Sequence, residues 1–130
     1  MKEPTWVDEK EASAINEMAL SQFGGLGGGA RDANLFRAAI ARPVNKWHYD
    51  DPAPDLFKLA AAYCYGIAKG RAFHDGNKRT AYVVAVTFLA INGVTFESEQ
   101  TQIVKTMVAV ADGSMTEQKL AKWFRKLSSK

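Results

Sequence analysis

A polar segment with several charges lies between the two most apolar parts of this 130-residue chain. This polar loop, residues 71–80, reads Arg-Ala-Phe-His-Asp-Gly-Asn-Lys-Arg-Thr. The apolar segment after it predicts a helix that begins near Asn77. The first turn of a helix has N–H groups without intrahelical partners and a partial positive charge, and it binds phosphate readily. The position of the loop therefore indicates a site for an anionic ligand.

Four residues of the polar loop fit such a site. Gly76 permits a close backbone approach or a positive φ. Lys78 and Arg79 place cations at a helix end where each costs about 0.3–1 kcal/mol, and a bound anion would reverse that cost. Asp75 has two interpretations, since its carboxylate can cap the helix or hold Mg²⁺ beside a phosphate. The alternative is a capped surface loop with solvated Lys and Arg, because Asp-Gly-Asn is common in turns.

The polar loop also resembles a family signature. The run Phe73-His74-Asp75-Gly76-Asn77-Lys78-Arg79 is similar to the signature loop of the Fic/Doc family. Further similar pieces are Gly24-Gly25, Arg31-Asp32, Ala41-Arg42-Pro43, Tyr63 to Lys69 and Thr80 to Gly93. The resemblance covers nearly the whole chain, and it agrees with a compact all-α bundle of about six helices without a substantial sheet.

Two positions resemble the Doc branch of that family. Lys78 stands where Fic enzymes have a second glycine, and Tyr82 stands where they often have a final arginine. The Doc branch resembles a protein kinase rather than an AMP-transferase. The resemblance therefore implies a toxin of a bacterial toxin–antitoxin module, which uses ATP and Mg²⁺. It would transfer the γ-phosphate to a hydroxyl of a translation elongation factor and stop protein synthesis, and a cognate antitoxin would be its partner.

The resemblance also implies roles within the polar loop. The residues expected to bind the nucleotide are Gly76, Asn77, Lys78 and Arg79. Those expected to take part in catalysis are Arg71, Asp75, Lys78 and Arg79, with Asp75 as the Mg²⁺ ligand. Phe73 would anchor the loop in the core.

Arg71 departs from the family pattern at the position of the catalytic histidine, and Ala72 replaces the usual proline. Imidazole can remove a proton from the target hydroxyl near neutral pH, whereas arginine stays protonated. His74 is the nearest replacement, although its position varies in the family. The chain would therefore be an attenuated enzyme. The alternatives are a catalytically inactive module that binds nucleotide or antitoxin, or an AMP-transferase.

Composition predicts one globular domain over residues 1–130. The 47% hydrophobic and 24% charged residues are typical of soluble domains. A net charge of +3, without a helix of clustered Arg and Asn, argues against nucleic-acid binding. Cys64 is the only cysteine, so no disulfide is expected. The polar N-terminus and the absence of a long apolar run predict a cytoplasmic protein without a membrane span.

Apolar periodicity and turn residues predict where the helices lie. The first spans about residues 8–22. The second begins at an Asp32 cap and stops at Pro43, and residues 44–51 are irregular. The predicted elements that follow are a helix from Pro54 in its first turn to about Lys69, a helix over 77–91, a short extended piece at 94–96, a helix over 103–111 and a helix opened by a Ser114–Glu117 capping box. The third and fourth helices are apolar on most sides and are expected in the middle of the bundle.

Three other segments invite a functional interpretation. Residues 24–29 are rich in glycine but lack the Gly-Lys-Ser/Thr of a P-loop. Near the site they would form a flap for substrate, with Arg31 in contact with target or nucleotide. The cluster Trp47-His48-Tyr49 is expected in a loop, and it or the first helix would be the floor on which an antitoxin tail folds. Ser13 to Glu17 only partly resembles the inhibitory helix motif of some Fic proteins, and we interpret the match as chance.

Overall fold

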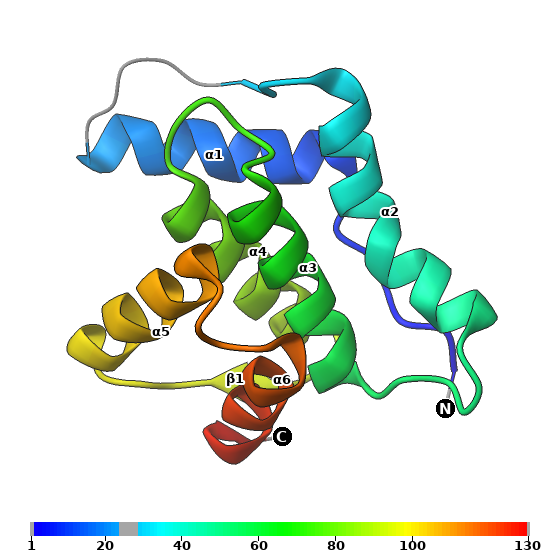
Figure 1. Cartoon of the computed structure of the whole chain (residues 1–130). Coiled ribbons are helices and arrows are strands. Elements are labelled where there is room, and N and C mark those ends of the chain that lie inside the picture. The colour runs from blue at the N-terminus through cyan, green and yellow to red at the C-terminus, as the bar shows by residue number, and fades with distance from the viewer. Residues whose placement is uncertain (1, 24–28, 130) are drawn as a thin grey trace.

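The computed structural model describes residues 2–23 and 29–129. The helices in this part of the chain are α1 (Glu9–Phe23), α2 (Ala33–Tyr49), α3 (Leu56–Gly70), α4 (Asn77–Ile91), α5 (Gln100–Asp112) and α6 (Glu117–Lys126) (Figure 1). Two short strands, β1 (Thr95–Phe96) and β2 (Ser128–Ser129), pair antiparallel. The expected all-α bundle without a substantial sheet is confirmed.

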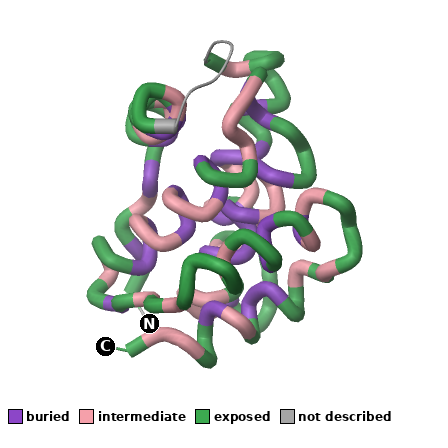
Figure 2. Tube along the Cα trace, turned by 90° about the vertical axis from the view of Figure 1, so that its left-hand side faces the viewer, coloured by how far each residue is buried: buried purple, intermediate pink, exposed green. Residues whose placement is uncertain are grey.

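The central helix of the bundle is α3, which packs against α2, α4, α5 and α6 (Figure 1). Its residues 59–64 are all fully buried, and three of them are consecutive alanines that let neighbouring helices approach closely. At Gly66 the approach to α2 is close as well, since a Cβ there would lie 3.6 Å from the Cα of Ala39. Figure 2 shows how the buried residues gather towards the interior of the trace. The third and fourth helices thus form the middle of the bundle, as expected.

The predicted end of the second helix at Pro43 is wrong, because α2 continues to Tyr49. A proline inside a helix removes one hydrogen bond and costs about 3 kcal/mol. Tertiary contacts offset this cost here. Pro43 is buried, Trp47 packs against the core, and the ammonium of Lys46 lies 3.8 Å from the carboxylate of Glu117 on α6. Residues 44–49, expected to be irregular, are therefore helical.

Two predicted helix starts also need correction. The N-cap of α6 is Thr116, whose hydroxyl accepts a hydrogen bond from the N–H of Lys119. The hydroxyl of Ser114 instead donates to the carbonyl of Ala109, so it closes α5 and opens no capping box. The N-cap of α3 is Asp55, so Pro54 precedes the helix rather than lying in its first turn.

A charged pair joins α3 to α6. The guanidinium of Arg125 lies 2.5 Å from the carboxylate of Asp55. Burial alone would raise the pKa of this carboxyl, but the hydrogen bond from the N–H of Lys58 and the nearby guanidinium outweigh it and leave the pKa below its usual value. Elsewhere in α3, the thiol of Cys64 is buried among apolar groups, which raises its pKa. No helix among the described residues is long and apolar enough to cross a membrane.

Candidate functional site: an anion cavity and an adjoining groove

Left-handed residues stand at both ends of the connection between α3 and α4. Arg71 is the C-cap of α3 with a φ of 51°, and Gly76 is the N-cap of α4 with a φ of 74°. Among the described residues, Arg71 is the one non-glycine residue with a positive φ. That conformation costs a residue with a Cβ roughly 1–2 kcal/mol. The two turns bring the last residues of α3 and the first residues of α4 to the same end of the bundle (Figure 1).

The side chain of Asn77 braces the polar loop from within. Its Oδ1 accepts a hydrogen bond from the N–H of Phe73 at 2.9 Å, and its Nδ2 donates to the carbonyl of Phe73 at 2.8 Å. The ring of Phe73 is fully buried and lies 5.1 Å from that of Phe36. Phe73 thus anchors the loop in the core, as expected. The amide of Asn77 therefore shapes the loop through these two hydrogen bonds.

A cavity of about 300 Å³ lies against the polar loop. Its lining consists of Ala68, Arg71, His74, Asp75, Gly76, Asn77, Lys78, Arg79 and Ala111. All the residues that the sequence analysis assigned to catalysis, nucleotide or metal therefore meet around one space. We call this space the anion cavity, because three cationic side chains and a single carboxylate surround it.

The start of α4 adds to the positive character of the anion cavity. The N–H of Thr80 donates to the carbonyl of Gly76 at 2.9 Å, which is the first turn of the helix. The N–H groups of Asn77 and Lys78 lie before this first hydrogen bond, at the N-terminal end of α4, which has a partial positive charge. A phosphate group in the cavity would meet both this helix end and the cations of Lys78 and Arg79.

The carboxylate of Asp75 does not cap α4. The N-cap is Gly76, and α4 has no capping hydrogen bond from a side chain. Instead, Oδ1 of Asp75 accepts the N–H of Gly76 at 2.7 Å. The described residues contain no group of three or more His, Cys, Asp or Glu arranged to hold a metal. A single carboxylate beside a phosphate site nevertheless fits Mg²⁺, which takes one or two carboxylates together with phosphate oxygens.

A second segment is fixed against the polar loop. The N–H of Arg31 donates to the carbonyl of Ala72 at 3.0 Å, and the N–H of His74 donates to the carbonyl of Gly29 at 3.1 Å. The Nε of Arg31 also donates to the carbonyl of Arg71 at 2.9 Å. This guanidinium therefore contacts the end of α3. The contact expected from the sequence was instead with target or nucleotide. Residues 24–28 of the predicted flap lie outside the described part of the chain.

Asn16 is a site residue that the sequence analysis missed. It is fully buried on α1. Its Nδ2 donates to the carbonyl of Asp75 at 2.9 Å and to the hydroxyl of Thr80 at 3.0 Å, and its Oδ1 accepts the N–H of Gly29 at 3.3 Å. The signal in the sequence is an asparagine at helical spacing from the buried Ala12, on the face of α1 that was expected to be apolar.

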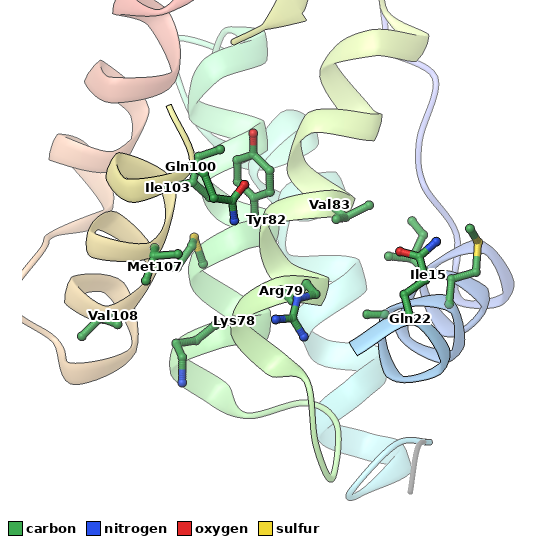
Figure 3. Close-up of a pocket in the computed structure, with 13 residues that line it drawn as sticks. Ile15, Gln22, Lys78, Arg79, Tyr82, Val83, Gln100, Ile103, Met107 and Val108 are labelled. Carbon is green, nitrogen blue, oxygen red and sulfur yellow. The ribbon is translucent and has the colours of Figure 1, made fainter. Parts of the chain in front are cut away.

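An apolar groove of about 430 Å³ adjoins the anion cavity, between α1, α4 and α5 (Figure 3). Its lining consists of Ile15, Met18, Ala19, Gln22, Lys78, Arg79, Tyr82, Val83, Gln100, Ile103, Val104, Met107 and Val108. Lys78 and Arg79 also line the anion cavity, so the two spaces share a cationic border. Met18 and Val104 are 60% and 52% exposed, respectively, and they lie in one groove with other apolar side chains, which is typical of an interaction site.

The aromatic cluster at residues 47–49 lies in the last turn of α2, not in a loop. This turn and the polar loop are at opposite ends of the molecule in Figure 1. His48 lies 3.6 Å from the carboxylate of Glu3, and Tyr49 is 83% exposed. Of the two floors expected for a partner, the one along the first helix borders the apolar groove, and the one at residues 47–49 lies away from it.

This chain is similar to known proteins over most of its length. The sequence model of the Fic/DOC family matches residues 6–89, which include the polar loop. The "Protein kinase doc" of Escherichia phage P1 is 33% identical over 122 residues, which cover 93% of this chain and 94% of that protein. The "Toxin Doc" of Mycolicibacterium smegmatis is 45% identical over 69 residues, or 53% of either chain.

Proposed function

The chain belongs to the Fic/Doc family, and on that premise we propose that it is a Doc-like toxin that transfers phosphate from ATP to a hydroxyl of a translation elongation factor. The observation that carries the proposal is the anion cavity, where the start of α4 and the side chains of Lys78 and Arg79 surround one space. The kinase name of the phage relative favours phosphate over AMP as the transferred group.

Binding and catalysis would use the same groups. The N–H groups at the start of α4 hold phosphate oxygens, and Lys78 and Arg79 neutralise the charge that spreads over the phosphoryl oxygens in the transition state. Asp75 would hold Mg²⁺, which supplies further neutralisation of phosphate charge when bound. Phosphoryl transfer depends mostly on such positioning and charge, so a small cavity with several cations is suited to it.

The transfer also needs a destination for one proton. The hydroxyl oxygen of the target attacks the γ-phosphorus, the bond to the β-phosphate oxygen breaks, and ADP leaves. The hydroxyl proton must pass to a base. Arg71 occupies the family's base position and cannot accept a proton near pH 7, although its guanidinium can stabilise phosphate charge. Transfer by this chain is therefore slow, while nucleotide binding is retained.

The second candidate function is a binding module that holds nucleotide or antitoxin without turnover. The specific observation in its favour is again Arg71, which lines the cavity and stands where the resemblance implies the catalytic base. The two candidates share the anion cavity and differ in whether phosphate leaves the nucleotide.

The apolar groove supports an antitoxin as partner. An amphipathic segment that folds on binding would lay its apolar side chains on Ile103 and Met107 of α5 and on Ile15 of α1. Because Lys78 and Arg79 border both spaces, a bound segment would also cover the approach to the anion cavity. Inhibition would then come from a second chain rather than from a helix of this one.

Labelled ATP separates these functions. The purified chain and an Arg71→His variant are each incubated with a bacterial lysate and with ATP labelled on the α- or the γ-phosphate. Label on a protein from γ-labelled ATP alone supports phosphate transfer. Label from α-labelled ATP would contradict it in favour of AMP transfer. Absence of label with both chains, together with ATP-dependent thermal stabilisation, would leave the binding module.

A further inference from the structure

We infer that Asn16 is a positioning residue that orients the carboxylate of Asp75, acting through the peptide bond between Asp75 and Gly76. The inference rests on the proposed function, in which that carboxylate holds Mg²⁺ beside the nucleotide. Asn16 belongs to α1 and is 59 residues from Asp75 in sequence, yet its amide lies 2.9 Å from the Asp75 carbonyl.

The planarity of the peptide bond carries the argument. In a trans peptide the C=O and the N–H point in opposite directions. On one side of this peptide, the carbonyl of Asp75 accepts the amide of Asn16. On the other side, the N–H of Gly76 donates to Oδ1 of Asp75 at 2.7 Å. Asn16 therefore fixes the direction of the N–H that holds the carboxylate.

The amide of Asn16 has one possible orientation. A carbonyl can only accept, so the atom that faces the Asp75 carbonyl must be the NH₂ group. A backbone N–H can only donate, so the atom that faces Gly29 must be the oxygen. The contact with Thr80 at 3.0 Å completes the set. A fully buried amide with three partners is held more firmly than an exposed one.

Gly76 makes this support necessary. With a φ of 74° and no side chain, it permits rotation of the preceding peptide plane more readily than any other residue would. A Cβ at Gly76 would lie 3.4 Å from the Nδ2 of Asn16, so the amide packs directly against this flexible point. Asn16 thus supplies from α1 the rigidity that the glycine itself lacks.

The test is a Mg²⁺ titration at fixed ATP, with thermal stabilisation of the protein as the readout. The Asn16→Asp variant keeps the size of the side chain and the acceptor for Gly29, but it replaces the donor to the Asp75 carbonyl. Loss of an outer-shell partner typically costs about 10- to 100-fold in metal affinity. Asn16 acts on the carboxylate through the Gly76 N–H, so the Mg²⁺ concentration at half-maximal stabilisation should rise by about tenfold, the lower end of that range. The Thr80→Val variant is the matched control, since it disturbs the same buried amide without touching the Asp75–Gly76 peptide. It should lower the melting temperature and leave the Mg²⁺ midpoint within about twofold, because the hydroxyl of Thr80 contacts Asn16 and not the peptide that holds the carboxylate.

Asn16→Ala provides a second variant if a buried carboxylate prevents folding, with the same shift expected. An Asp75→Asn background isolates the route: there, Asn16→Ala should change the Mg²⁺ dependence no further. If the parent chain responds to Mg²⁺ and the Asn16 variants keep its midpoint while melting at a lower temperature, Asn16 is purely structural and the inference is overturned. If the parent chain itself shows no Mg²⁺-dependent stabilisation by ATP, the proposed function fails, and the inference fails with it.

Discussion

The polar loop contains adjacent polar residues with two different roles. Lys78 and Arg79 face the anion cavity and offer charge, whereas Asn77 spends both ends of its amide on the backbone of Phe73. The effect of a substitution depends on which of these roles it removes. Loss of a cation should weaken binding of an anionic ligand. Loss of the Asn77 amide should instead destabilise the loop that carries the cations.

Substitution of Asn77 should separate these effects. Asn77→Ala leaves the N–H and the carbonyl of Phe73 without their partners, which should lower the free energy of unfolding by about 1–3 kcal/mol and reduce stabilisation by ATP–Mg²⁺. Asn77→Asp keeps the acceptor for the Phe73 N–H, so it should recover part of the stability. Its negative charge repels phosphate, so it should not recover the nucleotide effect. Chemical denaturation and thermal shift measure the two quantities. Full stabilisation by ATP in Asn77→Asp would show that the loop binds no phosphate near this residue.

Residue chemistry could be predicted from the sequence only where it depends on local order. The grouping of Asp75, Lys78 and Arg79 around one cavity follows from their adjacency at a helix start. The roles of Asn16 and of Arg31 do not, because their partners are 59 and 40 residues away along the chain. A buried asparagine and an exposed arginine give no sign of such partners before the fold is known.

Among the elements, α4 begins and ends where the sequence predicts, while α2 does not end at Pro43. The start of α4 is decided locally, since Gly76 can take the left-handed conformation that the turn requires. The length of α2 is set by tertiary contacts that a local pattern does not contain, among them the packing of Pro43 and Trp47 and the ion pair of Lys46 with Glu117. Helix boundaries set by tertiary contacts are therefore the part of the fold that the sequence left open.

Gly76 allows a direct test of the start of α4. Gly76→Ala places a Cβ on a residue with φ of 74° and within 3.4 Å of Asn16 and Leu20. Gly93→Ala is the matched control, because Gly93 has a φ of 85° with nothing near its Cβ. Both variants should lose roughly 1–2 kcal/mol of unfolding free energy through backbone strain. Only Gly76→Ala should also lose stabilisation by ATP. Equal ATP effects in both variants would dissociate the start of α4 from the ligand.

The whole molecule joins the anion cavity to the apolar groove, and neither space belongs to a single element. The groove needs α1, α4 and α5 together, and Lys78 and Arg79 of α4 form its border with the cavity (Figure 3). The sequence indicated a partner surface along the first helix but not its opposite wall, because α5 is about 80 residues further along the chain. One arrangement of helices thus places the proposed partner surface beside the anion cavity.

A charge introduced into the groove should therefore weaken binding of the antitoxin without changing the affinity for the nucleotide. Val104→Glu puts a carboxylate on an exposed apolar residue of the groove, which should cost little stability and weaken binding of the cognate antitoxin at least tenfold, the effect of about 1.4 kcal/mol. Tyr49→Glu makes a similar change on the exposed end of α2 and should leave the antitoxin unaffected. Calorimetry against the product of the neighbouring gene measures both. If Tyr49→Glu weakens antitoxin binding and Val104→Glu does not, the partner surface lies on α2 and not in the groove.

The most direct test of the whole account is the rate of γ-phosphate transfer from ATP to purified elongation factor, for the chain as it stands and for Arg71→His. Histidine tolerates the left-handed conformation of residue 71 better than most side chains, so the variant should keep the fold. A general base contributes about 10²- to 10⁴-fold, and transfer should rise by that factor while both proteins bind ATP. Equal rates for the two proteins, with His74→Ala abolishing transfer, would contradict the account and make His74 the base.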